Sequence, residues 1–130
     1  MSKGPEANFW NTIRKSLPTK AFATRIENKH GGGVPDVHIV WNGFAFWIEL
    51  KTAKSSKVKI SPHQIAWHTA YWARGGKSFY LVKHLSTSDI FLFEGEKGVD
   101  LLEKGIFETE GSRFKNLAPL WEFLAPLAPQ

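Results

Sequence analysis

Two acidic side chains and a lysine in residues 36–51 have the types and spacing that metal-assisted chemistry on phosphates requires. The segment reads DVHIVWNGFAFWIELK, with Asp36 at its start and Glu49 and Lys51 at its end. Carboxylate oxygens are ligands that Mg²⁺ prefers, and Mg²⁺ keeps several waters while sharing its coordination shell with a substrate phosphate. The three residues can act together only if the intervening chain folds back on itself.

Asn42-Gly43, in the middle of the segment, predicts this reversal. Between two runs of aromatic and β-branched residues, Asn-Gly is the strongest short-range signal for a β-hairpin with a two-residue turn. If these two residues form the turn, positions that face one another across the hairpin sum to 85. Asp36 then lies opposite Glu49, with cross-strand Cβ atoms about 4.5–5.5 Å apart, and Lys51 follows on the same face.

The same alternation predicts the core face of the hairpin. Side chains of a strand alternate between its two faces, and one face is apolar throughout: Val37, Ile39, Trp41, Phe44, Phe46, Ile48 and Leu50. The other face carries the two acids, which destabilise a sheet when they lie directly opposite one another. A divalent cation would remove this repulsion, which predicts Mg²⁺, with Mn²⁺ as a substitute. The alternative is a solvated acid pair with Lys51 as its salt-bridge partner.

Composition restricts the classes of protein and of site. A chain of 130 residues is expected to form a single domain, residues 1–130. Cysteine is absent, which excludes disulfides, thiolate metal sites and a cysteine nucleophile. No apolar run approaches the ~20 residues of a membrane-spanning helix, and the N-terminus lacks a signal-peptide core. We therefore expect a cytoplasmic protein with no membrane partner.

The charge is unevenly distributed along the chain. Residues 1–84 contain 13 Lys and Arg but 4 Asp and Glu, whereas residues 85–130 contain 4 and 8. Because Lys and Arg supply most of the non-specific affinity for phosphate backbones, this asymmetry indicates a nucleic-acid partner. Solubility alone is the alternative explanation.

Helices and further strands are expected around the hairpin. Helical spacing and Pro5 predict a first helix over residues 5–17. Residues 21–28 alternate as a strand, with Phe22, Thr24 and Ile26 on an apolar face and Ala23, Arg25 and Glu27 on a charged one. Ser61-Pro62-His63-Gln64 is a capping box that opens a helix over residues 62–74. Strands are predicted over 78–82 and 90–93, and short or helical pieces over 99–107 and 117–124. This order predicts an α/β domain with a mixed central sheet flanked by helices.

These residues carry a family resemblance. Pro35-Asp36 followed by Glu49-Leu50-Lys51 resembles the signature of the PD-(D/E)XK nucleases. The motifs GGGVPD, IELK and SPHQ, with the lysine-rich loop between the last two, are similar to the VRR-NUC group and more distantly to archaeal-type Holliday junction resolvases. The resemblance extends from Glu6 to Lys83 and implies a restriction-endonuclease-like core of helix, strand, β-hairpin, helix and strand.

The resemblance also implies roles for single residues. Asp36, Glu49 and the carbonyl of Leu50 would be metal ligands, and Lys51 would orient or activate the attacking water. Glu6 would be a supplementary metal ligand, although its place in the first helical turn is also explained by the helix dipole. Gln64 would hold a phosphate or a water at the edge of the site, although the capping box alone also explains it.

Other basic and imidazole side chains are candidates for contact with DNA. Lys54, Lys57 and Lys59 lie in a loop, expected to be flexible, beside the proposed metal site, where they would bind phosphates or be only solvated. The remaining candidates are Arg25, Lys29, His30 and His63. The alternative to a DNA contact for Arg25 is an ion pair with Glu27. The alternative for His30 and the glycines beside it is a simple turn. His38 shares the face of the acids, whereas His68 and His84 are expected to pack or to lie at the surface.

The resemblance implies an Mg²⁺-dependent endodeoxyribonuclease that is selective for branched DNA, a Holliday junction or a flap, in recombination, repair or replication. A phage source and a homodimer are further implications. The alternative is a non-catalytic nucleic-acid-binding module, or an accessory subunit, that retains the nuclease fold.

Overall fold

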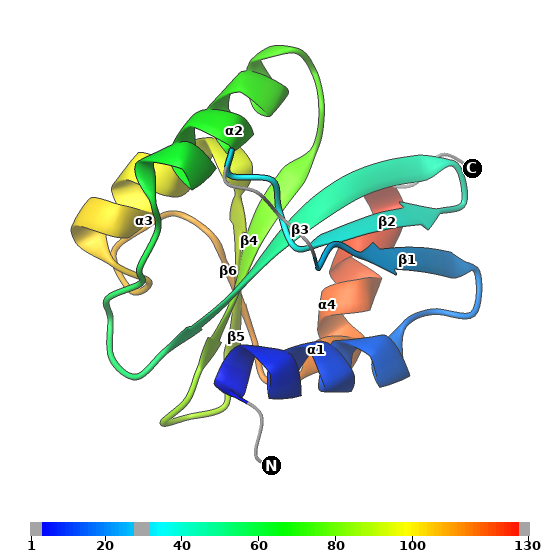
Figure 1. Cartoon of the computed structure of the whole chain (residues 1–130). Coiled ribbons are helices and arrows are strands. Elements are labelled where there is room, and N and C mark those ends of the chain that lie inside the picture. The colour runs from blue at the N-terminus through cyan, green and yellow to red at the C-terminus, as the bar shows by residue number, and fades with distance from the viewer. Residues whose placement is uncertain (1–3, 28–31, 128–130) are drawn as a thin grey trace.

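A computed structural model describes residues 4–27 and 32–127, which form one six-stranded mixed sheet with helices on both faces (Figure 1). The strands follow one another across the sheet in chain order, and every neighbouring pair is antiparallel except β3 and β4, which are parallel. The strands are β1 (Ala21–Arg25), β2 (Val37–Trp41), β3 (Phe44–Ala53), β4 (Ser78–His84), β5 (Ile90–Glu94) and β6 (Ser112–Phe114). The predicted α/β class with a mixed sheet is confirmed.

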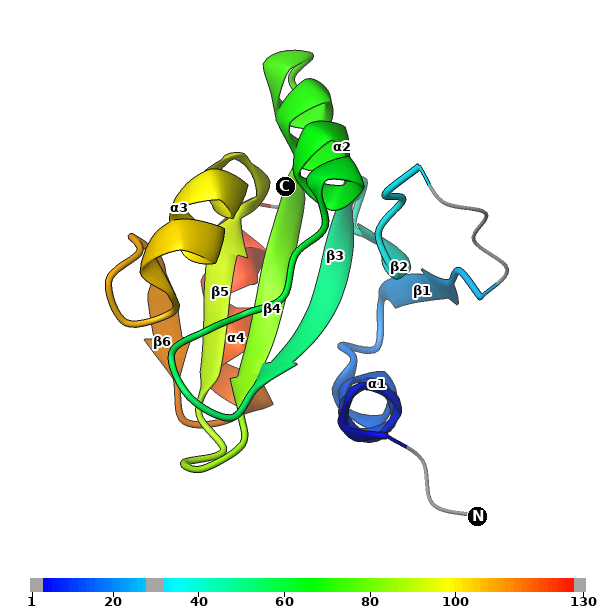
Figure 2. The same cartoon turned by 60° about the vertical axis from the view of Figure 1, so that its left-hand side comes forward.

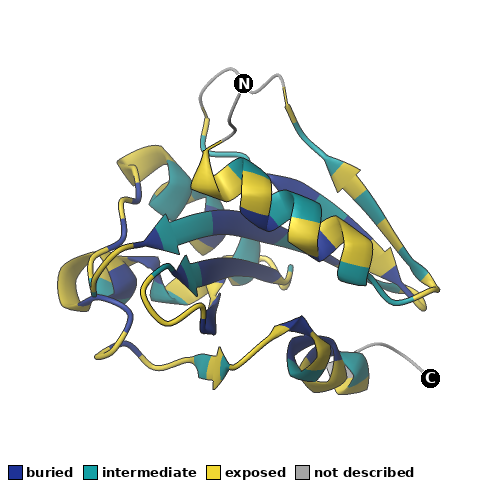
Figure 3. Ribbon diagram, turned by 90° about the horizontal axis from the view of Figure 1, so that it is seen from below, coloured by how far each residue is buried: buried dark blue, intermediate teal, exposed yellow. Residues whose placement is uncertain are grey.

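Helices form a layer on each side of this sheet. Those assigned are α1 (Pro5–Ser16), α2 (Pro62–Ala73), α3 (Gly98–Lys104) and α4 (Leu117–Leu124), with short 3₁₀ turns η1 (Gly95–Lys97) and η2 (Ala125–Leu127). The helices α1 and α4 pack on one face, and α2 and α3 cover part of the other (Figures 1 and 3). The parallel pair needs a crossover connection, and α2 is part of it.

The β2–β3 hairpin forms in the predicted register. Asn42 and Gly43 form its turn with φ values of 51° and 82°, and a turn with two positive φ values matches the twist of the flanking strands. Trp41 pairs with Phe44, and the pairing continues through Ile39 with Phe46 to Val37 with Ile48. The apolar face of the hairpin packs against α1 and α4, as its alternation predicts.

The sheet separates two clusters of buried side chains. The larger lies between the sheet and the α1–α4 layer and includes Phe9, Ile48, Leu81 and Trp121. The smaller lies under α3 and includes Tyr80, Val82 and Leu101. Because strand residues alternate between these clusters, Glu49 faces the α2 side while its neighbours Ile48 and Leu50 fill the larger core.

The predicted faces of the first strand are wrong. Ala21 and Ala23 face the large core, whereas Phe22 is 71% exposed. Pairing with β2 places Ala23 opposite Ile39 and Phe22 opposite Val40, and register, not the apolar character of one residue, decides which face of a strand is inward.

Two smaller differences concern the end of the first helix and the acidic end of the chain. The first helix ends at Ser16, before the predicted residue 17. The strand β6 was not expected, because three residues are too few to show a period.

Within the described residues, no helix is both long and apolar enough to cross a membrane.

Candidate active site

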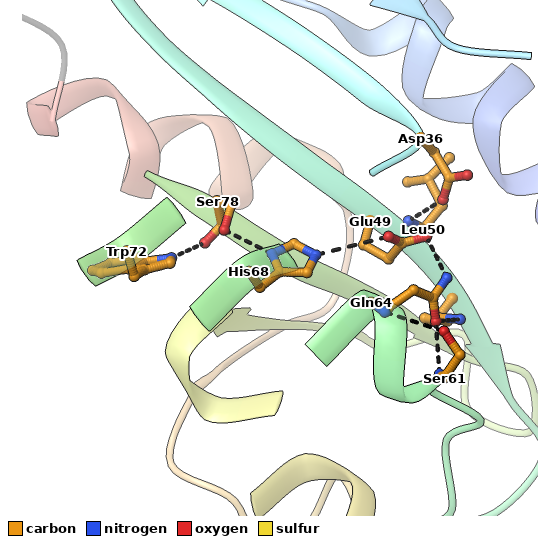
Figure 4. A network of polar contacts seen from close by, with 9 residues as sticks. Asp36, Glu49, Leu50, Ser61, Gln64, His68, Trp72 and Ser78 are labelled. Carbon is orange, nitrogen blue, oxygen red and sulfur yellow. Dashed lines mark hydrogen bonds and ion pairs between the residues drawn. The ribbon is translucent and has the colours of Figure 1, made fainter. Parts of the chain in front are cut away.

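Asp36 and Glu49 lie together at the open end of the hairpin (Figure 4). Both are buried, with exposed fractions of 8% and 1%. The Leu50 N–H donates a hydrogen bond of 2.8 Å to Asp36 Oδ2, so the carboxylate of Asp36 is fixed to β3 next to Glu49. The Asp36 carbonyl accepts from the Ile26 N–H at 2.8 Å, which ties the same residue to the chain beyond β1. Asp36 is therefore held from both sides.

The glycine-rich segment before Asp36 passes directly against the start of α2. Gly33 has a φ of +76°, and a Cβ atom there would lie 2.1 Å from the His63 carbonyl oxygen. Only glycine tolerates both this conformation and this close approach. The segment leading into Asp36 is thereby placed against the helix that carries Gln64.

Gln64 joins the acid pair to the lysine. Its Nε2 donates to Glu49 Oε2 at 3.1 Å, and its Oε1 accepts from Lys51 Nζ at 3.0 Å. A neutral amide, which is both donor and acceptor, can hold a carboxylate and an ammonium at once. Lys51 and Glu49 thus keep a fixed separation on the same face of β3.

The capping box explains why Gln64 occupies this position. The Gln64 N–H donates to Ser61 Oγ at 3.1 Å, and the Ser61 N–H donates to Gln64 Oε1 at 3.0 Å. Both contacts satisfy backbone donors that the first helical turn leaves without an intrahelical partner. The two interpretations of Gln64 from sequence, a helix cap and an edge of the site, are therefore compatible.

His68 is a component of the site that the sequence analysis did not identify. It is fully buried, its Nδ1 lies 2.7 Å from Ser78 Oγ, and its Nε2 lies 3.7 Å from Glu49 Oε1. Burial and then the positive charge of Lys51 lower the pKa of His68 from 6.5 to about 4, so the imidazole is neutral near pH 7. One signal was present in the sequence, because His68 follows Gln64 by four residues and so shares its helix face.

The surroundings of His68 are closely packed. Trp72 Nε1 donates to the Ser78 carbonyl at 2.8 Å, and a Cβ atom on Gly95 would lie 2.3 Å from Ser78 Oγ. Tyr80, which pairs with Glu49 across the parallel strands, contacts the His68 ring at 4.2 Å between centroids. Burial and the nearby Glu49 raise the pKa of Tyr80, which keeps its phenol neutral.

The lysine-rich loop is anchored by its neighbours, which corrects the expectation of a flexible loop. Val58 and Ile60 are buried in the smaller core, and the Ser56 carbonyl accepts from the Ile106 N–H at 2.8 Å. The alternate residues Lys57 and Lys59 are exposed, as is Lys54. With Lys51, these three lysines line a cavity of about 450 Å³. The loop therefore holds these three lysines around the same cavity as Lys51.

Other candidate residues lie in different places. Glu6 is exposed at the start of α1 and borders the same cavity as Lys51. His63 is exposed in the first turn of α2. Arg25 lies on the core side of β1, with a buried Nη1 and its guanidinium 5.7 Å from the Trp10 ring centroid, which does not support a contact with DNA. Lys29 and His30 lie outside the described residues.

The donors present fit a hard, oxygen-preferring cation. The carboxylates of Asp36, just before β2, and of Glu49, within β3, lie together at the open end of the hairpin. Mg²⁺ is bound through one or two carboxylates together with water and phosphate oxygens. Asp36 and Glu49 therefore suit Mg²⁺ or Mn²⁺, and the backbone of Leu50 lies beside them.

The architecture is an α/β fold with a six-stranded mixed sheet between two helical layers. One solved structure with a similar fold is Hjc, a Holliday junction resolvase from the hyperthermophilic archaeon Archaeoglobus fulgidus, known at 1.6 Å resolution. The two structures match with a TM-score of 0.53 over 88% of this chain and 89% of Hjc, at 17% sequence identity. No family model matches the sequence, and neither does any curated protein. The comparison establishes the fold.

Proposed function

We propose that this protein is a metal-dependent endonuclease that hydrolyses phosphodiester bonds in branched DNA. The observation that carries the proposal is the assembly of Asp36, which precedes β2, with Glu49 and Lys51 of β3 at the open end of the hairpin. Gln64 is hydrogen-bonded to the last two. The fold shared with Hjc, a Holliday junction resolvase, supports branched DNA as the substrate. The motifs GGGVPD, IELK and SPHQ favour a VRR-NUC-like protein.

Each residue of the assembly has a separate task in hydrolysis. Asp36 and Glu49 would hold Mg²⁺, which when bound supplies Lewis-acid polarisation of a phosphate and of water. The ammonium of Lys51 is held by Gln64, where it can orient the attacking water and offset the negative charge that develops on the phosphate. The exposed lysines at 54, 57 and 59 would bind the adjacent backbone phosphates.

Cleavage assays on flap, four-way-junction and linear DNA, each with Mg²⁺, Mn²⁺ or EDTA, test this proposal. We expect metal-dependent cutting that favours the branched substrates. The variants Asp36→Asn and Glu49→Gln should bind DNA without cutting it. DNA binding by the native chain without cutting under any metal would instead indicate a non-catalytic binding module.

The basic loop provides a second test, because each phosphate that a lysine neutralises adds to the salt dependence of binding. Affinity should fall steeply with salt for the native chain, and Lys54→Ala with Lys57→Ala should reduce that slope. An unchanged slope would remove the loop from the DNA-binding surface. We also expect a homodimer, as for a resolvase-like enzyme, and sedimentation analysis measures the oligomeric state.

A further inference from the structure

The outer face of the hairpin carries an ordered series of cross-strand pairs. The register pairs Val40 with Ala45 and, one pair further from the turn, His38 with Trp47. Asp36 and Glu49 follow on the same face at the open end of the hairpin. Successive pairs on one face are about 7 Å apart, because a strand rises ~3.3 Å per residue. An aromatic pair thus lies immediately beside the acid pair.

Aromatic rings continue from this pair in both directions. The ring centroids of His38 and Trp47 are 4.6 Å apart, and those of Trp47 and Trp67 are 5.6 Å apart. On the opposite side, Phe22 of the edge strand pairs with Val40, and these two side chains are 71% and 37% exposed. We call the set of Phe22, His38, Trp47 and Trp67 the aromatic shelf.

The shelf lies at the edge of the layer formed by α2. Figure 2 shows α2 over β3 and β4, with β1 and β2 lying beyond its edge. The core side of these two strands is covered by α1 and α4. Among the described residues, Phe22 and Val40 are exposed, and His38, Trp47 and Trp67 are half-buried. Apolar side chains that gather at one place on a surface often mark a binding site.

The charges on either side of the acid pair differ. Lys51 and the lysine-rich loop lie on one side, and they suit phosphates. The shelf lies on the other side and contains no acidic residue. A DNA strand presents both bases and phosphates, and each of these two groups matches one of these surfaces.

We propose that the aromatic shelf stacks unpaired bases of DNA next to the scissile phosphate. This inference rests on the proposed function, because it takes DNA as the ligand. Base stacking on aromatic side chains is sequence-tolerant and requires bases that are not enclosed in a duplex. The preferred substrate is therefore DNA with unpaired nucleotides beside the cleavage point, such as a flap, a bulge or a frayed branch, not a continuous duplex.

Binding measured in EDTA separates this inference from catalysis. Fluorescence anisotropy would compare a continuous duplex with the same duplex carrying a short flap, for the native chain, Phe22→Ser and Trp47→Leu. Each variant should weaken binding of the flap about 5- to 100-fold and leave binding of the duplex unchanged. Val99→Ser, at an α3 side chain that is 50% exposed, is the matched control and should change neither.

Abasic flaps test the shelf without any change to the protein. Removing the bases should weaken binding of the native chain as much as Trp47→Leu weakens binding of the normal flap. Binding of the abasic flap to Trp47→Leu should be little weaker than with either change alone. Phe22→Ser serves where Trp47→Leu fails to fold, because the Phe22 side chain is largely exposed. A 2-aminopurine in the flap should be quenched on binding to the native chain and less quenched with Phe22→Ser.

Three outcomes would overturn the inference. The first is that the variants weaken binding of flap and duplex equally. The second is that abasic flaps bind as tightly as flaps with bases. The third is that Phe22→Ser sediments as a smaller species while it still prefers the flap over the duplex, which would make the shelf an interface between copies of the chain. If the protein prefers the flap but does not cleave DNA with any metal, the nuclease proposal is wrong and the shelf inference stands. If the protein cleaves DNA but does not prefer the flap, the shelf inference is wrong and the nuclease proposal stands.

Discussion

Asp89 and the Asp36–Glu49 pair are both buried, but different partners surround them. Asp89 Oδ2 lies 2.7 Å from Arg113 Nε and 3.5 Å from Lys115 Nζ, and the hydrogen bond from Arg113 is the main cause that lowers the pKa of Asp89. Asp36 and Glu49 are two acids held by the Leu50 amide and the Gln64 side chain, with Lys51 beside them.

The difference separates an acid whose partners are two cations from the acid pair to which the proposed function assigns a metal. At Asp89, one carboxylate meets two cations, so the fold itself compensates the charge. At the pair, two carboxylates lie side by side, and Gln64 holds the ammonium of Lys51 next to Glu49. Like charges that face one another in a sheet are destabilising, and under the proposed function a bound cation would relieve this repulsion.

Neutralising one acid at each place should give opposite results. Asp36→Asn should reduce cleavage about 10³-fold or more, because a lost metal ligand removes several kcal/mol of transition-state stabilisation. The same change should raise the melting temperature, since it removes repulsion between like charges. Asp89→Asn should lower the melting temperature and leave the cleavage rate of the folded protein unchanged. Calorimetry measures the melting temperatures, and single-turnover assays measure the cleavage rates. A lower melting temperature for Asp36→Asn would contradict the comparison.

The Gln64 amide, which bridges Glu49 and Lys51, should have a smaller effect on cleavage than the two acids. Gln64→Ala should slow cleavage about 10- to 100-fold, the usual cost of removing a group that positions a metal ligand. Ser61→Ala is the matched control, because it removes the helix cap, worth about 1 kcal/mol, without touching Glu49 or Lys51. Equal cleavage rates for the two variants would show that Gln64 acts only as a cap.

The two regions should also respond to acid in different pH ranges. His68 has a pKa of about 4 in the folded chain and 6.5 in the unfolded chain, so between these values only the unfolded chain binds the proton. Stability should therefore fall by about 3 kcal/mol as the pH decreases from 6.5 to 4. The pKa of Asp89 is lowered from 3.8, so its contribution is lost only below that value. Urea unfolding at a series of pH values measures the free energy of unfolding. In His68→Gln this free energy should change little between pH 6.5 and pH 4.

Metal binding should stabilise the acid pair and not Asp89. A ligand that binds only the folded state at 100 times its Kd adds about 2.7 kcal/mol to the free energy of unfolding. Mn²⁺ or Mg²⁺ should produce such a shift in the native chain and in Asp89→Asn, and no shift in Asp36→Asn. An equal shift in all three would place the cation elsewhere.

The hairpin was predictable from sequence because its determinants are local. Asn42-Gly43 fixes both the turn and the register, and register alone brings Asp36 beside Glu49. Gln64 was predictable through the capping box, which involves residues three apart. These features depend on short stretches of chain, where composition and spacing carry most of the information.

The features that the sequence did not reveal depend on distant partners. The outward position of Phe22 follows from pairing with β2, and an edge strand contains no local sign of its inward face. His68 became part of the site through Ser78 and Glu49, which lie on two other elements. The fixed position of the lysine-rich loop comes from a contact with Ile106, fifty residues beyond the loop.

The double role of Gln64 links the start of α2 to the activity of the whole molecule. In most helices the first turn opens and closes without affecting anything else. Here the same side chain caps the helix and contacts Glu49 and Lys51, so local opening at residues 61–64 and disassembly of the site are one event. The hydrogen-exchange rate of the Gln64 amide then reports how often the contacts of Gln64 with Glu49 and Lys51 are broken.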